Sequence, residues 1–162
     1  LIEAYKELHT DKKLVIAGGS SDTDDFMQEI QTLATGDDRI IFTGFVAGQA
    51  LEELYSNAYL YLLPSDLEGM PLSLLEAMSY GNCCVVSDIA ECSEVVEDKA
   101  VTFQKSNVQD LKEKLQRLCD DPATVQKYKN EAADFICSKY NWDEITQKTL
   151  EVYEDRYENL ND

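Results

Sequence analysis

Residues 59–87, which read YLYLLPSDLEGMPLSLLEAMSYGNCCVVS, decide the fold of this chain. Short apolar runs at the two ends of this stretch predict strands, and the segment between them predicts a loop followed by a helix from Pro71 to about Tyr80. Proline is favoured at a first helical position because its missing N–H would be unpaired there, and Gly81 suits the C-terminal cap. Wholly apolar strands joined by a helix are typical of a parallel sheet covered on both faces.

The same alternation of apolar strands and amphipathic helices continues along the chain. Strands are predicted over residues 13–17, 39–43, 59–63, 83–87 and 100–103, and helices over residues 1–9, 22–35, 49–57, 71–80, 91–97, 108–119, 123–140 and 143–160. Ser21 or Asp22 is expected to cap the second helix, whose Phe26, Ile30 and Leu33 share one face. The predicted fold is α/β, a Rossmann-like, doubly wound parallel sheet in one domain over residues 1–162. The first helix begins without a capping residue, so we expect that a preceding segment is missing.

The charge of the chain narrows the class of partner. Its 162 residues carry 14 Lys and Arg against 32 Asp and Glu, a net charge of −18. This acidity argues against nucleic acid or an anionic membrane surface as a partner, and no basic patch is visible, although membrane contact by a longer protein is left open. A small anionic ligand is not excluded, because backbone amides at a helix N-terminus hold phosphate without cationic side chains.

The cysteines indicate a reducing compartment. They are five in number, and Cys83 and Cys84 are adjacent within an apolar run. Reduced thiols in a cytoplasmic protein explain this pattern better than a set of disulfides does. No C-x-x-C spacing occurs and His9 is the only histidine, so no metal site is expected.

Ligands of doubly wound sheets sit beyond the carboxyl ends of the strands. In this chain the loops at those ends cover residues 18–21, 44–48 and 64–69. Gly18 and Gly19 resemble a turn that lets a phosphate approach the backbone, although two glycines are common in such loops. Gly44, Phe45 and Val46 can offer backbone groups to the edge of a nucleobase, and a plain turn is the alternative.

The two glutamates of the third loop and its helix are the strongest candidates for binding. Glu76 stands among apolar residues, so it is expected to be buried and to accept hydrogen bonds from two hydroxyls of a sugar or ribose. The alternatives are a side chain that points out between two apolar stripes and a salt bridge to a neighbouring helix. Glu68 lies in the loop with Gly69 and Met70, whose backbone N–H groups are expected to face the ligand beside the positive end of the helix dipole. The alternative for Glu68 is a favourable interaction with that dipole alone.

The run from Glu68 to Glu76 resembles the E-x7-E motif of the family 4 glycosyltransferases, known as glycosyl transferases group 1. The resemblance extends over essentially the whole chain. It includes LVIAGG at residues 14–19, IFTGFV at 41–46, LYSNAYLYLLPS at 54–65, the stretch 81–94, and the aromatic signal at 140–142 before the last helix. Trp142 of that signal is expected to be a packing anchor.

This resemblance implies the C-terminal, donor-binding half of a GT-B fold that lacks its first strand, and a retaining transfer that needs no metal or cofactor. The donor implied is a nucleotide-sugar such as a UDP- or GDP-sugar, and the acceptor is held by a missing N-terminal domain. Glu68 corresponds to the catalytic-site glutamate that contacts the transferred sugar, and Glu76 to the one that binds the ribose. The remaining donor-binding positions are Gly69, Met70 and Pro71, together with Gly18, Gly19, Gly44, Phe45 and Val46.

Departures from the family pattern limit what the chain is expected to do alone. The Arg…Lys-Gly pair that neutralises the diphosphate in the family is absent, so we expect weak nucleotide binding at most and no transfer. Asn82-Cys83 replaces the usual x-Pro and is expected to be structural. Two alternatives remain: a non-catalytic nucleotide-sugar-binding module, and a GT-B-fold sugar-nucleotide epimerase, which is disfavoured because no histidine is available for the cleft.

Overall fold

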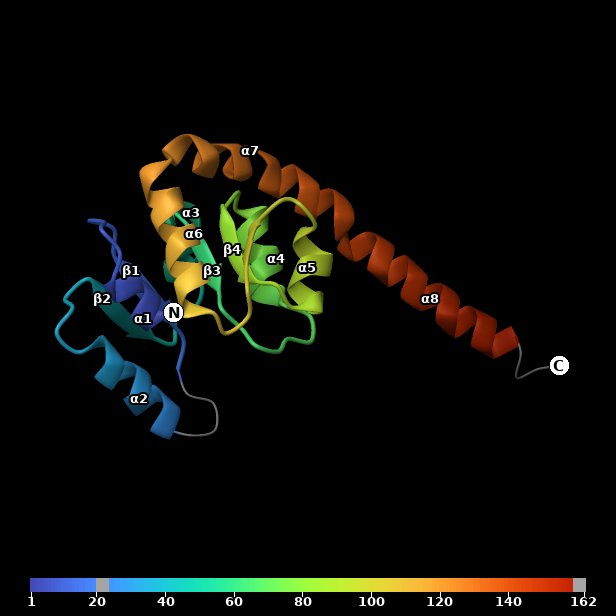
Figure 1. Ribbon diagram of the computed structural model, residues 1–162. Helices are drawn as coiled ribbons and strands as arrows, with labels where there is room; N and C mark the ends of the chain where they lie inside the picture. Colours follow the sequence, from blue (N-terminus) through green and yellow to red (C-terminus); the bar gives the residue numbers. More distant parts are fainter. Residues whose placement is uncertain (20–23, 159–162) are drawn as a thin grey trace.

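The computed structural model describes residues 1–19 and 24–158, and in this part five strands alternate with eight helices (Figure 1). The strands are β1 (Leu14–Ala17), β2 (Ile40–Gly44), β3 (Tyr61–Leu63), β4 (Cys84–Ser87) and β5 (Val101–Phe103). The helices are α1 (Ile2–Lys6), α2 (Asp24–Ala34), α3 (Gln49–Asn57), α4 (Leu72–Ser79), α5 (Ala90–Val96), α6 (Val108–Asp120), α7 (Pro122–Lys139) and α8 (Trp142–Glu158). The predicted order of elements is confirmed, with ends that differ by a few residues.

All strand pairs are parallel, as the sequence predicts, but their hydrogen bonds divide them into two sheets. One sheet pairs β1 with β2, and the other has the order β3-β4-β5. Within the described residues, no strand joins β1 to β3 by hydrogen bonds. Both sheets still contribute to one apolar core, which includes Leu14 of β1 and Val85 of β4.

Strand β4 shows why the fold is doubly wound. It is buried along its whole length, and its side chains alternate between two cores. Val85 points to the core shared with α1 and α6, whereas Cys84 and Val86 join the core shared with α4, α5 and α7. Helices therefore cover both faces of this sheet, and every connection returns the chain to the same end of a parallel strand.

Two expectations about apolar side chains are wrong. Phe26 of α2 is 65% exposed and Leu33 is 40% exposed, so the predicted apolar face of α2 is only partly covered. The reason is that α2 lies at the edge of the fold and contacts mainly α1. Trp142 is 75% exposed, because α8 extends away from the two sheets instead of packing on them (Figure 1). The expected capping residues Ser21 and Asp22 lie outside the described residues.

Within the described part of the chain, no helix combines the length and the apolar character needed to cross a membrane.

Candidate functional site

The loop between β3 and α4 is held in place by the last residue of β4 and by the loop that follows β5. The Ser87 hydroxyl, which is almost completely buried, donates a hydrogen bond to the carbonyl oxygen of Ser65. The Ser106 hydroxyl donates to Asp66 Oδ1 at 2.9 Å. Because both donors come from the carboxyl ends of neighbouring strands, the β3–α4 loop has a defined position above the edge of the sheet where ligands of this fold class bind.

Unpaired backbone amides surround the start of α4. Pro71 is the N-cap residue and not the first helical residue, so α4 begins one residue later than predicted; the Pro71 carbonyl oxygen accepts hydrogen bonds from the amides of Leu74 and Leu75. Among the described residues, no protein acceptor is recorded for the N–H groups of Gly69 and Met70. Such amides, together with the helix dipole, favour an anion or a hydroxyl oxygen. Glu68 lies beside them and is half-buried.

Glu76 does not have the burial that the sequence predicts. Its side chain is exposed, and it lies on the same stripe of α4 as Leu72 and Tyr80, which are also exposed. Figure 1 shows α4 beside β4, and the opposite stripe of the helix, with Leu74 and Ala77, is the one that packs into the core. Glu76 is therefore not a buried carboxylate; it points out between two apolar stripes, because the side of α4 with Leu74 and Ala77 packs into the core.

The carboxylate of Glu76 nevertheless has a specific partner. The hydroxyl of Tyr55, on α3, donates to Glu76 Oε2 at 3.1 Å. This partner is a neutral hydroxyl, so the alternative of a salt bridge to a neighbouring cation is not what the structure shows; no Lys or Arg is recorded within ion-pair distance of Glu76 among the described residues. One carboxylate oxygen is thus oriented by Tyr55, and lone pairs of both oxygens stay available to further donors.

The loops after β1 and β2 meet each other. The Gly18 N–H donates to the carbonyl oxygen of Gly44 at 2.8 Å, and both glycines have a positive φ, of 124° and 67°. Such backbone is strained for residues with a Cβ. Gly19 follows as an exposed residue, and Phe45 is 85% exposed. Gly18 and Gly44 are therefore brought together as a turn pair, on the sheet that does not carry Glu68 and Glu76.

Val46 lines a surface hollow of about 380 Å³ between the end of β2 and α3. The other lining residues are Thr43, Ala50, Glu53, Leu54 and Asn57. An apolar hollow that begins at the carboxyl end of a strand is a suitable place for a flat ring. The role of the 44–46 segment beside a base stays a prediction.

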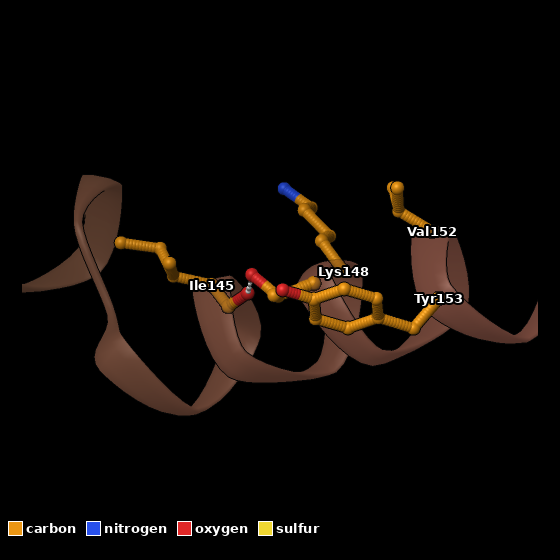
Figure 2. A pocket seen from close by; sticks show the side chains of 5 residues that line it. Ile145, Lys148, Val152 and Tyr153 are labelled. Atoms are coloured by element: carbon orange, nitrogen blue, oxygen red, sulfur yellow. Dashed lines mark hydrogen bonds between the residues drawn. The ribbon is translucent and has the colours of Figure 1, made fainter.

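A second hollow, of about 410 Å³, lies on α8 and is lined by Ile145, Lys148, Thr149, Val152 and Tyr153. Figure 2 shows that these side chains all stand on one helix, with the Thr149 hydroxyl donating to the Ile145 carbonyl oxygen at 2.7 Å. A ligand cavity needs walls from several elements. This hollow is therefore the uncovered side of a helix and is not part of the candidate site.

Sequence reasoning missed Tyr55 and Ser87. Tyr55 belongs to a helix predicted with the correct bounds and to the family-like stretch 54–65, but neither signal gives it a role, and its contact with Glu76 spans 21 positions of sequence. The sequence places Ser87 in a strand, and its polar character within an otherwise apolar run is the signal that it needs a buried partner.

Comparison with known proteins gives a family match. The sequence model described as Glycosyl transferases group 1 matches residues 1–135. An uncharacterized glycosyltransferase of Methanocaldococcus jannaschii is 31% identical over 143 residues, which are 87% of this chain and 36% of that protein. The alpha-maltose-1-phosphate synthase of Mycobacterium tuberculosis is 27% identical over 167 residues, which cover 94% of this chain and 43% of that enzyme.

Solved structures agree on the fold. Anabaena HepE in complex with UDP-glucose superposes with a TM-score of 0.88 at 19% identity, over 96% of this chain and 44% of that chain. The chain thus spans less than half the length of these relatives.

Proposed function

Because this chain belongs to the group 1 glycosyltransferases, we propose that it binds the nucleotide-sugar donor for retaining, metal-independent transfer of a glycosyl group. The observation that carries the proposal is that Glu68, the free amides of Gly69 and Met70, and Glu76 all lie on one loop-and-helix unit at the carboxyl end of β3. The acceptor would be held by another part of a longer protein. The UDP-glucose bound to Anabaena HepE supports a nucleotide-sugar as the ligand.

The proposed roles follow the chemistry of each group. Glu68 contacts the transferred sugar, and the amides of Gly69 and Met70 donate to the diphosphate or to sugar hydroxyls. Glu76 accepts the ribose hydroxyls, and its exposure leaves it open to a ligand from solvent. Gly44, Phe45 and Val46 lie beside the base. A carboxylate suits hydroxyl donors because, when ionised, it only accepts hydrogen bonds.

The charge of the chain sets the expected strength of binding. When a nucleoside diphosphate leaves, negative charge develops on its oxygens. Cationic side chains or oriented backbone amides must stabilise that charge. Residues 64–80 contain no Lys or Arg, and the net charge of the chain is −18. We therefore propose that cations from the rest of a longer protein complete the site, and that the chain alone binds nucleotide weakly and transfers no sugar.

Thermal protection tests the proposal. The melting temperature of the 162-residue chain is measured with increasing UDP, GDP or ADP, and with inorganic diphosphate to separate nucleoside recognition from charge. Binding to the folded state stabilises it by RT ln(1 + [L]/Kd), so millimolar ligand is expected to raise the melting temperature for at least one nucleotide. Glu76→Ala is expected to abolish this rise.

Glu113→Ala is the matched control. Glu113 is an exposed helical glutamate that also accepts one side-chain hydrogen bond, from Gln109 at 2.8 Å, but it lies on α6 at the other face of the sheet. Its removal is expected to leave nucleotide protection unchanged. Absence of protection by all three nucleotides would contradict donor binding, and submicromolar affinity or turnover by this chain alone would contradict the need for outside cations.

A further inference from the structure

Tyr55 is anchored on several sides beside Glu76. Its ring stacks on Tyr80 with a centroid distance of 5.4 Å and an interplanar angle of 22°, and it lies 6.0 Å from the ring of Tyr61. Its hydroxyl donates to Glu76 Oε2 at 3.1 Å and lies 3.5 Å from the carbonyl oxygen of Ser73. The hydroxyl is therefore fixed in space by the ring packing, before any ligand arrives.

The direction of this hydrogen bond is also fixed. Burial raises the pKa of Tyr55 well above its usual range, and the nearby Tyr61 hydroxyl and the hydrogen bond to Glu76 act in the same direction. At neutral pH the tyrosine therefore keeps its proton and donates it. Glu76, which as a carboxylate only accepts, receives this bond on one defined oxygen.

A fixed donor changes what an exposed glutamate can do. A free glutamate side chain samples several rotamers, and ordering it for a ligand costs conformational entropy. Tyr55 already selects an orientation, and the lone pairs it leaves unused can accept two neighbouring hydroxyls. We propose that Tyr55 is a positioning residue, which orients Glu76 toward the vicinal hydroxyls of a ribose and so sets the preference of this site for ribonucleotides over deoxyribonucleotides. The inference rests on the proposed function.

The test compares two probes that differ in one hydroxyl, UDP and 2′-deoxy-UDP, by calorimetric titration; GDP or ADP with its 2′-deoxy form replaces this pair if it protects the chain better. Tyr55→Phe keeps the ring that stacks on Tyr80 and removes only the donor. We expect this variant to bind the ribonucleotide about three- to tenfold more weakly, as for the loss of one partly exposed hydrogen bond, and to bind the deoxy form almost as the wild type does. The ratio of the two affinities is thus expected to fall.

Tyr61→Phe is the matched control, because it removes a hydroxyl that donates to Ser73 Oγ at 2.8 Å and leaves the Tyr55–Glu76 pair intact. Its affinity ratio is expected to equal that of the wild type. These readouts separate positioning from a general loss of structure, which would weaken both probes equally.

The outcomes distinguish this inference from the function on which it rests. The inference alone is overturned if the wild-type chain binds and Tyr55→Phe leaves the affinity ratio unchanged. It is also overturned if Tyr55→Phe weakens the binding of both probes equally. Failure of the wild type to bind any of the nucleoside diphosphates would overturn the proposed function. Binding without preference for the ribonucleotide would overturn the role of Glu76 and, with it, that of Tyr55.

Discussion

The side-chain amide of Asn82 donates a hydrogen bond to the carbonyl oxygen of Tyr55 at 2.9 Å, and so joins the ends of α3 and α4. The same amide donates to the carbonyl oxygen of Ala77 at 3.0 Å, and Asn82 is only 1% exposed. The residue that departs from the family pattern before β4 is therefore a structural bridge. It holds the helix turn from which the Tyr55 side chain reaches Glu76.

Asn82→Ala is expected to lower the free energy of unfolding by about 1–3 kcal/mol, because the carbonyl oxygen of Ala77 loses a buried hydrogen bond and that of Tyr55 a partly buried one. Urea unfolding monitored by circular dichroism measures this change. Asn57→Ala is the control, since Asn57 donates to the Glu53 carbonyl oxygen at 2.8 Å on an exposed surface. This control is expected to change stability by no more than about 0.5 kcal/mol, and equal losses in the two variants would contradict the bridging role.

Gly81→Ala is expected to destabilise the chain by about 1–2 kcal/mol. Gly81 has a φ of 72°, and its N–H and that of Asn82 donate to Met78 and Ala77, which closes the end of α4 in a Schellman motif. A Cβ at this position would lie 3.5 Å from the Lys129 carbonyl oxygen, an ordinary contact, so the cost comes from the left-handed backbone. Gly81→Asn is expected to cost less, since asparagine tolerates this conformation; equal losses by urea unfolding would point to a steric cause.

The sequence predicts the elements well because their signals are local. Apolar runs mark the strands, and the bounds predicted for α3, 49–57, are those of the structure. The C-terminal cap at Gly81 is also a local signal, which the positive φ confirms. The division of the strands into two sheets is not local, since pairing depends on which strands become neighbours in space.

The candidate site shows the same limit. Apolar residues surround Glu76 in the sequence, but α4 has two apolar stripes, and only the stripe with Leu74 and Ala77 meets the core. Composition does not say which stripe is covered, so the expected burial of Glu76 is wrong and the outward-pointing alternative is the one that holds. The donor that Glu76 does have, Tyr55, comes from another helix through tertiary packing, and a single sequence carries no signal for that pairing.

Thiol reactivity is expected to divide the five cysteines by burial. Cys137 is exposed and should react first with Ellman's reagent, while Cys83, Cys84 and Cys92 are buried. Burial also raises the pKa of Cys83 and of Cys92 to about 11, which depletes the reactive thiolate at pH 8. Native protein should therefore show one fast thiol, which Cys137→Ser removes, and all five should react in urea. Fast reaction of three or more thiols in the native chain would contradict the described core.

Acid is expected to weaken the connection between α1 and β2 through Asp37. A hydrogen bond from the Arg39 side chain is the main cause that lowers the pKa of the Asp37 carboxyl to about 2, with Nε and Nη2 of Arg39 at 2.9 and 2.7 Å from the carboxylate oxygens. Arg39 Nη1 in turn donates to the carbonyl oxygens of Leu8 and Thr10, which follow α1. The ion pair with Asp37 thus orients the Arg39 guanidinium, which links the residues after α1 to β2.

The direction of this pH effect on stability follows from the numbers of protons that the folded and unfolded chains bind. Between about pH 4 and pH 2 the unfolded chain protonates Asp37 more readily than the folded chain does, so the contribution of this carboxylate is complete above pH 4 and is lost as the pH falls toward 2. Urea unfolding at several pH values should therefore show a stability difference between wild type and Asp37→Asn that shrinks across this window. Arg39→Gln, which removes the partner, should lose the same part of the pH dependence. If the stability difference between wild type and either variant stays constant from pH 5 to pH 2, Arg39 does not lower the pKa of Asp37 in the folded chain.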